Sequence, residues 1–134
     1  MRSKILFISG SASDARSLSR MLHALPMVLD HAEGVQSARA KLRRDSYEVI
    51  LTEAGLPDGD WLDVLQLARS SAVESEVIVT DPHADARFWS EALNRGAYDL
   101  VAQPFDQAEV RRILYNACSR FHAPVYHHVH AAAV

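Results

Sequence analysis

The sequence VILTEAGLPDGD, residues 49–60, joins a short apolar run to a carboxylate and then to a turn. Val49 to Leu51 are strand formers with no polar residue between them, as in a strand whose two faces are both covered. The Leu-Pro-Asp-Gly sequence that follows contains residues typical of turns. The stretch therefore predicts a buried strand that ends close to Glu53, and it raises the question of what a carboxylate does there.

Apolar segments of the same kind recur along the chain and alternate with segments of helical periodicity. The expected strands are residues 5–8, 27–32, 47–52, 77–79 and 98–102. The expected helices are residues 14–25, 35–45, 60–68, 84–94 and 106–121, with Asp60 and Asp106 as N-caps and Gly96 as a stop. Five strand–helix repeats predict an α/β fold in which a five-stranded parallel sheet carries helices on both faces.

Composition narrows the class of protein. The 134 residues suffice for one domain, and no second domain is visible. Lys plus Arg is 14 and Asp plus Glu is 17, so the net charge is −3, which does not favour a nucleic-acid-binding surface. Cys118 is the single cysteine and cannot form an internal disulfide. The apolar runs are far shorter than the ~18 residues of a membrane span. We expect a cytoplasmic protein with no nucleic-acid partner and no membrane contact.

Ligands of parallel α/β sheets bind at the carboxyl ends of the strands. The residues at those ends are Ser9, Gly10, Glu53, Thr80, Asp81 and Gln103. The small polar loop Ser9–Ser13 opens the first helix, where backbone N–H groups can bind an anion. Capping of that helix by Ser11 or Ser13 is the simpler interpretation.

Three short motifs carry a resemblance to a known family. They are Leu56-Pro57-Asp58-Gly59-Asp60, Gly96-Ala97-Tyr98-Asp99 and Pro104-Phe105. With their spacing, the chain resembles a receiver domain of bacterial two-component response regulators, which has a flavodoxin-like fold. The resemblance covers residues 4–121, and residues 122–134 are expected to form a flexible tail.

The resemblance also implies which residues would carry the family's chemistry, and this sequence departs at each position. Typical receivers phosphorylate an aspartate at the end of the third strand, and that position holds Glu53. The matching positions of the other signature residues hold Ser9 and Gly10 for the acidic pair that binds Mg²⁺, Asp81 for the hydroxyl residue with Thr80 just before it, Gln103 for the lysine, and Leu100 for the aromatic switch residue.

These departures weaken the case for phosphorylation. Mg²⁺ prefers carboxylate and other oxygen ligands in octahedral array, and phosphoryl transfer depends on such charge neutralisation. We therefore expect no catalytic activity, no metal and no other cofactor. Glu53 is interpreted as a hydrogen-bonded strand-end residue, with permanent mimicry of a phosphoryl group as the alternative.

The resemblance places the partner surface on the fourth helix, fifth strand and fifth helix. The residues expected there are Trp89, Tyr98, Asp99 and Glu109, and they would bind a signalling protein or a second copy of the chain. The positions expected to pair with Asp99 and Glu109 hold Ile113 and Trp89, which favours a more apolar contact. Trp61 either lies beside the mouth of the former phosphorylation site or fills the core.

The sequence thus favours a degenerate receiver domain that signals by protein–protein contact without phosphorylation. Two alternatives remain: an anion or small-molecule binding module that uses the Ser9–Ser13 loop, and a receiver that a histidine kinase still phosphorylates. A transition-metal site is a weaker prediction. It would use the histidines near the carboxyl end, which are His122, His127, His128 and His130.

Overall fold

A computed structural model describes residues 2–122 of the chain. Its main sheet has five parallel strands in the order β2-β1-β3-β6-β7. They are β1 (Ser3–Ile8), β2 (Met27–Ala32), β3 (Val49–Glu53), β6 (Glu76–Asp81) and β7 (Asp99–Ala102). The predicted five-stranded parallel sheet is confirmed. A two-stranded antiparallel hairpin, β4 (Gly55–Leu56) with β5 (Gly59–Asp60), follows β3 and was not predicted.

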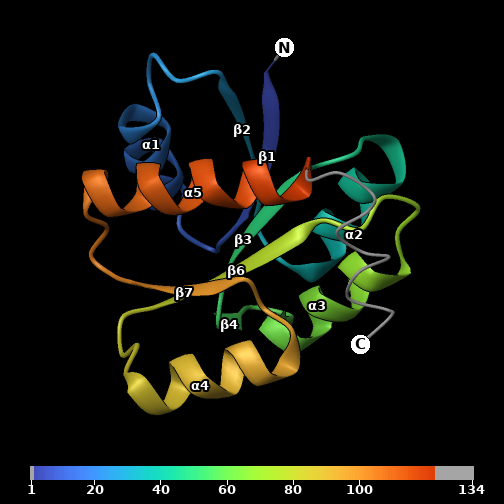
Figure 1. Cartoon of the computed structure of the whole chain (residues 1–134). Helices are drawn as coiled ribbons and strands as arrows, with labels where there is room; N and C mark the ends of the chain where they lie inside the picture. The colour runs from blue at the N-terminus through green and yellow to red at the C-terminus, as the bar shows by residue number, and fades with distance from the viewer. Residues whose placement is uncertain (1, 123–134) are drawn as a thin grey trace, which may run out of the picture.

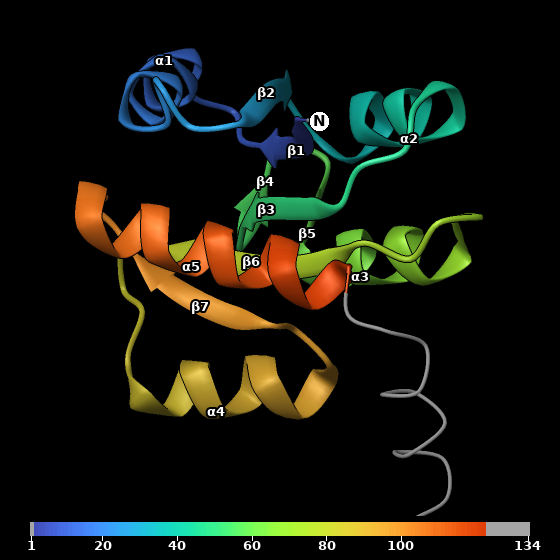
Figure 2. The ribbon, with the colours of Figure 1, turned by 45° about the horizontal axis from the view of Figure 1, so that its top comes forward.

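Five helices surround the sheet. They are α1 (Ala12–Met21), α2 (Val35–Arg44), α3 (Trp61–Ser70), α4 (Ala86–Arg95) and α5 (Gln107–Phe121). Figure 2 shows α1 and α5 on one side of the sheet, α2 and α3 on the other, and α4 beyond the edge strand β7. The flavodoxin-like arrangement that the resemblance implied is therefore present.

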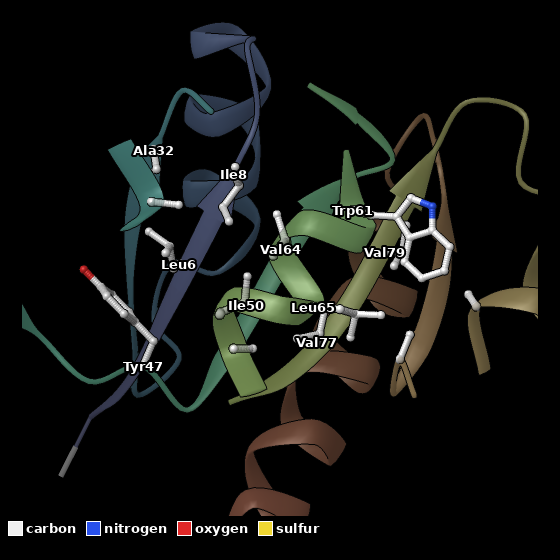
Figure 3. Close-up of a cluster of buried hydrophobic side chains, with 14 of the residues drawn as sticks. Leu6, Ile8, Ala32, Tyr47, Ile50, Trp61, Val64, Leu65, Val77 and Val79 are labelled. Atoms are coloured by element: carbon white, nitrogen blue, oxygen red, sulfur yellow. The ribbon is translucent and has the colours of Figure 1, made fainter. Parts of the chain in front are cut away.

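Each face of the sheet has its own apolar cluster. One cluster joins α2, α3 and α4 to the sheet and includes Leu6, Ile50 and Trp61. Figure 3 shows Trp61 and Tyr47 at opposite ends of this cluster. The other cluster joins α1 and α5 to the sheet and includes Phe7 and Leu114. Strands β1 and β3 supply side chains to both clusters, which explains why their sequences are apolar throughout.

Local sequence signals fix most helix ends. Ser11 caps α1 by accepting a hydrogen bond from the N–H of Asp14 at 3.1 Å. Asp60 caps α3 within a reciprocal capping box, and Asp106 caps α5. Gly96 ends α4 with a φ of +108°, a left-handed conformation that glycine adopts readily. The predicted caps and the glycine stop are confirmed.

Two helix boundaries differ from the prediction. Helix α1 ends at Met21, four residues before the expected Leu25, because the chain turns at Ala24, which has a φ of +72°. Helix α4 begins at Ala86 instead of Ala84, because the Asp85 carboxylate accepts a hydrogen bond from the N–H of Phe88 and caps the helix there.

The structure describes only the first residue, His122, of the predicted carboxyl-terminal tail. Most of the expected tail, including His127, His128 and His130, lies outside the described residues. His122 is described, and its Nε2 lies 3.4 Å from a carboxylate oxygen of Glu48. Between residues 2 and 122, His, Cys, Asp and Glu form no group of three or more that could hold a metal ion. In the same part of the chain, no helix has the length and apolar character required to span a membrane.

Candidate functional site

Glu53 is the last residue of β3 and lies opposite Thr80 in β6. The Thr80 side chain is fully buried, and its hydroxyl donates a hydrogen bond to the carbonyl oxygen of Val101 at 2.8 Å. Asp81 lies one residue further along β6, and its carboxylate accepts a hydrogen bond from the N–H of His83 at 2.9 Å. The hydroxyl residue in register with Glu53 is thus Thr80, while Asp81 is the last residue of β6 and its carboxylate bonds to the turn that follows.

Gln103 brings a neutral amide to Glu53. Its Nε2 lies 3.5 Å from Oε2 of Glu53, at the outer limit of a hydrogen bond. Gln103 follows β7, so this contact joins the carboxyl ends of two strands that are not neighbours in the sheet. A neutral donor orients a carboxylate but does not neutralise its charge.

The polar groups of Ser9, the first residue after β1, are already hydrogen-bonded within the protein. Ser9 is fully buried, its Oγ accepts a hydrogen bond from the N–H of Ser11 at 3.0 Å, and its carbonyl oxygen accepts one from Nε2 of His31 at 2.7 Å. Gly10 lies close to the ring of Pro57: a Cβ built on Gly10 would be 3.4 Å from Pro57 Cγ. The end of β1 therefore packs closely on the turn that follows β3.

These donors do not fit the magnesium ion that receivers typically hold. Ser9 offers one hydroxyl that already accepts a backbone hydrogen bond, and Gly10 has no side chain. Mg²⁺ binds in proteins through carboxylates and phosphate oxygens with near-octahedral geometry. Neither residue after β1 supplies an anionic oxygen, so Glu53 has no carboxylate partner from that strand.

The β4–β5 hairpin is fixed to helix α2 by Asp58, which sequence reasoning had treated only as a turn residue. Its carboxylate accepts hydrogen bonds from the N–H groups of Val35 at 2.7 Å and Gln36 at 3.0 Å. These two bonds hold the pKa of Asp58 below its usual value of 3.8. The N-cap position of α2 is Gly34, which has no side chain to cap the helix, so Asp58 performs that role from a distant part of the sequence.

The predicted partner residues lie in or next to α4, β7 and α5. The Trp89 side chain is 48% exposed, and its Nε1 donates a hydrogen bond to Oδ1 of Asp99 at 3.1 Å. Tyr98 and Glu109 are partly buried. Trp89, Tyr98, Asp99 and Glu109 are called the α4–β7–α5 face below. Whether a partner binds there stays a prediction.

Ile113 and Trp61 are both buried. Ile113 is 5% exposed, because it shares the inward stripe of α5 with Val110, Leu114 and Ala117. The prediction that Ile113 contributes to an apolar partner surface is wrong. Trp61 is 6% exposed and its ring lies 5.7 Å from that of Phe88 on α4, so it fills the core.

The family profile of the response regulator receiver domain matches residues 5–115. The chain belongs to this family. It is 26% identical over 116 residues to the response regulator protein PilR of Pseudomonas aeruginosa, a match that covers 87% of this chain and 26% of PilR. It is 30% identical over 116 residues to the transcriptional regulatory protein KdpE of Staphylococcus aureus, covering 83% of this chain and 48% of KdpE.

A solved structure gives the same fold. The beryllofluoride-activated receiver domain dimer of NtrC4 superposes with a TM-score of 0.80 at 24% identity, covering 88% of this chain and 98% of the other. The chain spans between about a quarter and a half of the length of the two curated relatives. It is therefore a receiver domain of two-component signalling, and what the longer relatives do besides is not transferred to it.

Proposed function

We propose that this receiver domain signals by protein–protein contact and that Glu53 is not a phosphoacceptor. The observation that carries the proposal is the set of neighbours around Glu53. Gln103 offers a neutral amide, and Ser9 and Gly10 offer no carboxylate. On this proposal the domain is a degenerate receiver whose signature positions are Glu53, Ser9, Gly10, Asp81, Leu100 and Gln103.

The physical reason is the charge that builds up during phosphoryl transfer. Catalysis of this reaction comes almost wholly from positioning and from neutralising the phosphoryl oxygens, usually by a metal ion and a lysine. Glu53 is also one methylene longer than aspartate, which moves its oxygens by about 1.5 Å. A displacement of that size alone slows a positioned reaction on the order of 100-fold.

The α4–β7–α5 face is the proposed partner surface. Tryptophan is enriched among the residues that dominate binding energy, and about half of the Trp89 side chain is exposed. Its hydrogen bond to Asp99 holds the indole in one orientation on the edge strand of the sheet. A partly immobilised aromatic loses less entropy when a partner covers it. The partner is a signalling protein or a second copy of this chain.

The anion-binding alternative receives no support from the Ser9–Ser13 loop. The N–H of Ser11 donates to Ser9, and the Ser11 hydroxyl accepts from the N–H of Asp14. Both groups would have to leave these partners to bind an anion. Ser11 therefore serves the first helix as its cap, and Ser9 holds the N–H of Ser11, which agrees with the simpler of the two interpretations of this loop.

Treatment with acetyl phosphate and Mg²⁺ tests the proposal. Intact mass spectrometry should show no added phosphoryl group on this chain, while a typical receiver treated in parallel gains one. A second comparison uses the variant Ser9→Asp/Gly10→Asp/Glu53→Asp/Gln103→Lys, which restores the family's charges. A hydroxylamine-labile phosphoryl group on the unaltered chain would overturn the proposal and favour a receiver that is still phosphorylated.

A further inference from the structure

Helix α1 and the start of β2 enclose a groove whose lining includes four apolar side chains, here called the α1–β2 groove. Its deeper part has a volume of about 520 Å³, and its lining includes Leu22, Leu25, Met27 and Leu29. A shallower part of about 480 Å³ continues along the outside of α1 and shares Ser19 and His23 with the first. Figure 1 shows the α1–β2 connection at the top of the view, near the beginning of β1 and away from β4. The groove therefore lies at the opposite end of the sheet from Glu53.

The charged residues on the rim of the groove are arginines. Arg2, Arg16, Arg20 and His23 line it, and its lining contains no Asp or Glu. All four of these side chains are exposed. Among residues 2–122 the cations in ion pairs are Lys4 and Arg120, so none of the three rim arginines has a carboxylate partner there.

The stability of helix α1 explains only part of this arrangement. Arg16 and Arg20 are four residues apart and lie on one stripe of the helix, and His23 lies in the turn that follows the last helical residue, Met21. Like charges at this spacing destabilise a helix. The helix dipole favours cations in the last turn, which explains Arg20. It does not explain Arg16, which lies more than one turn earlier, or Arg2, which lies before β1.

The wall of the groove contains a backbone conformation that is rare for its residue type. Ala24 has a φ of +72°, and it is the one non-glycine residue between 2 and 122 with a positive φ. L-residues with a Cβ seldom adopt this region, and such positions persist where the surrounding structure requires them. This turn directs the chain from α1 into β2 and so forms the side of the groove.

We propose that the α1–β2 groove binds an acidic amphipathic segment of a protein partner. The partner's carboxylates meet Arg16, Arg20 and Arg2, and its apolar side chains enter the hollow above Leu25 and Met27. Charge complementarity selects an acidic partner, because the charged residues of the rim, Arg2, Arg16 and Arg20, are all arginines. The hollow selects a protein segment over a lipid surface, because a bilayer is bound by apolar side chains that protrude. This contact is separate from the α4–β7–α5 face.

A designed peptide tests the groove directly. The probe is a fluorescein-labelled helical peptide with Leu at every third or fourth position and Glu elsewhere. Fluorescence anisotropy with the full chain should show saturable binding at low salt that weakens as salt is added. The double variant Arg16→Glu/Arg20→Glu should bind the probe at least about tenfold more weakly. The matched control Arg43→Glu, an exposed cation in the last turn of α2, should leave binding within about twofold.

A neutral probe and lipid vesicles provide two further tests of the groove. A probe with every Glu replaced by Gln should bind at least about tenfold more weakly than the acidic probe. Vesicles of phosphatidylcholine and phosphatidylserine should not sediment the chain. Absence of probe binding, equal binding by the Arg16/Arg20 and Arg43 variants, or vesicle binding that the Arg16/Arg20 variant abolishes would each overturn the proposal. Should the double glutamate variant fail to fold by circular dichroism, Arg16→Gln/Arg20→Gln replaces it and should weaken binding in the same direction.

Discussion

Glu53 ends a strand whose other residues are buried, and its own side chain is partly exposed. Among residues 2–122 its carboxylate has one hydrogen-bond donor, the Gln103 amide, at the long distance of 3.5 Å. A carboxylate in such surroundings can keep its hydration, so we expect the fold not to depend on its charge. This is a different situation from the fully buried Thr80 opposite, whose hydroxyl must have a partner and has one.

Glu53→Gln keeps the shape of the side chain and removes its charge. We expect the free energy of unfolding to change by less than about 1 kcal/mol, the range of an ordinary partly exposed substitution. Urea denaturation followed by circular dichroism measures it. A loss of several kcal/mol would show that the charge of Glu53 is part of the structure and would contradict its description as a strand-end residue.

The two tryptophans offer a matched pair. Trp61→Ala removes a side chain that packs on Phe88 inside the larger apolar cluster, so we expect a loss of about 3–5 kcal/mol of stability. Trp89→Ala removes a half-exposed ring and should reduce stability by less than about 1 kcal/mol. Denaturation of both variants under one set of conditions gives the comparison, and a reversed order would show that the burial of these residues is misassigned.

The sequence could not decide between core and surface for either tryptophan. Both occur in helical segments next to other apolar residues. The helical period alone does not show which face of a helix another helix or the sheet covers. Helix α4 lies at the edge of the sheet beyond β7 and fully buries only Ala92 among its residues. Trp89 therefore stays exposed although it belongs to an amphipathic pattern.

Helix ends were predictable where the capping residue is local. Asp60, Asp106 and Gly96 act within their own turns, so their spacing reveals them. The β4–β5 hairpin was missed because its strands have two residues each and no alternating pattern. The role of Asp58 was missed because its partner Val35 lies 23 positions away, and only the folded chain brings the two together.

We expect the cap that Asp58 provides to make helix α2 sensitive to acid. Because the folded-state pKa of Asp58 is lowered, its contribution to stability is complete above the usual 3.8 and is lost as the pH falls through the folded-state pKa. Asp58→Asn should therefore lower the melting temperature at neutral pH, and the difference from the unaltered chain should shrink below about pH 3.8. Thermal melts between neutral and acid pH measure this difference.

The control for that experiment is Glu91→Gln, which removes an exposed carboxylate on α4. Its melting temperature should follow that of the unaltered chain across the same range. A difference for Asp58→Asn that stays constant through the acid range would mean that the carboxylate's charge does not act on α2.

Gly96 tests the end of helix α4. Its φ of +108° disfavours any residue with a Cβ, and the Arg69 side chain occupies the space that the Cβ would fill. Gly96→Ala should reduce the free energy of unfolding by about 1–2 kcal/mol or more. Gly55→Ala is the matched control, because no atom lies within 4 Å of its built Cβ. Equal stability of the two variants in urea would show that neither the conformation nor Arg69 constrains this turn.

Over the whole molecule, three regions divide the surface. The carboxyl ends of the strands hold Glu53 and Gln103, the amino end of the sheet holds the α1–β2 groove, and the edge strand β7 carries the α4–β7–α5 face. The sequence predicted the first and third from a family resemblance. It could not predict the groove, because Arg2 and Met27 are brought to α1 only by the pairing of β1 with β2.

Two variants of the chain separate the contributions of Glu53 and of the α4–β7–α5 face to partner binding. Trp89→Ala and Glu53→Gln chains, each first shown to be folded, are compared with the unaltered chain in pull-downs from the source cell. Sedimentation velocity of the same proteins covers the case in which the partner is a second copy. We expect Trp89→Ala to weaken binding by about 2 kcal/mol or more, because an exposed aromatic anchor is lost from the α4–β7–α5 face.

Glu53→Gln should change the same binding by less than about 1 kcal/mol, because a strand-end carboxylate makes no differential contact with two states of the domain. If Glu53 instead mimics a phosphoryl group, removing its charge will abolish partner binding although Trp89 is intact. If Trp89→Ala retains full binding, the partner does not use this face. The two substitutions therefore report on different parts of the proposal, since one removes a surface contact and the other removes only a charge at the end of β3.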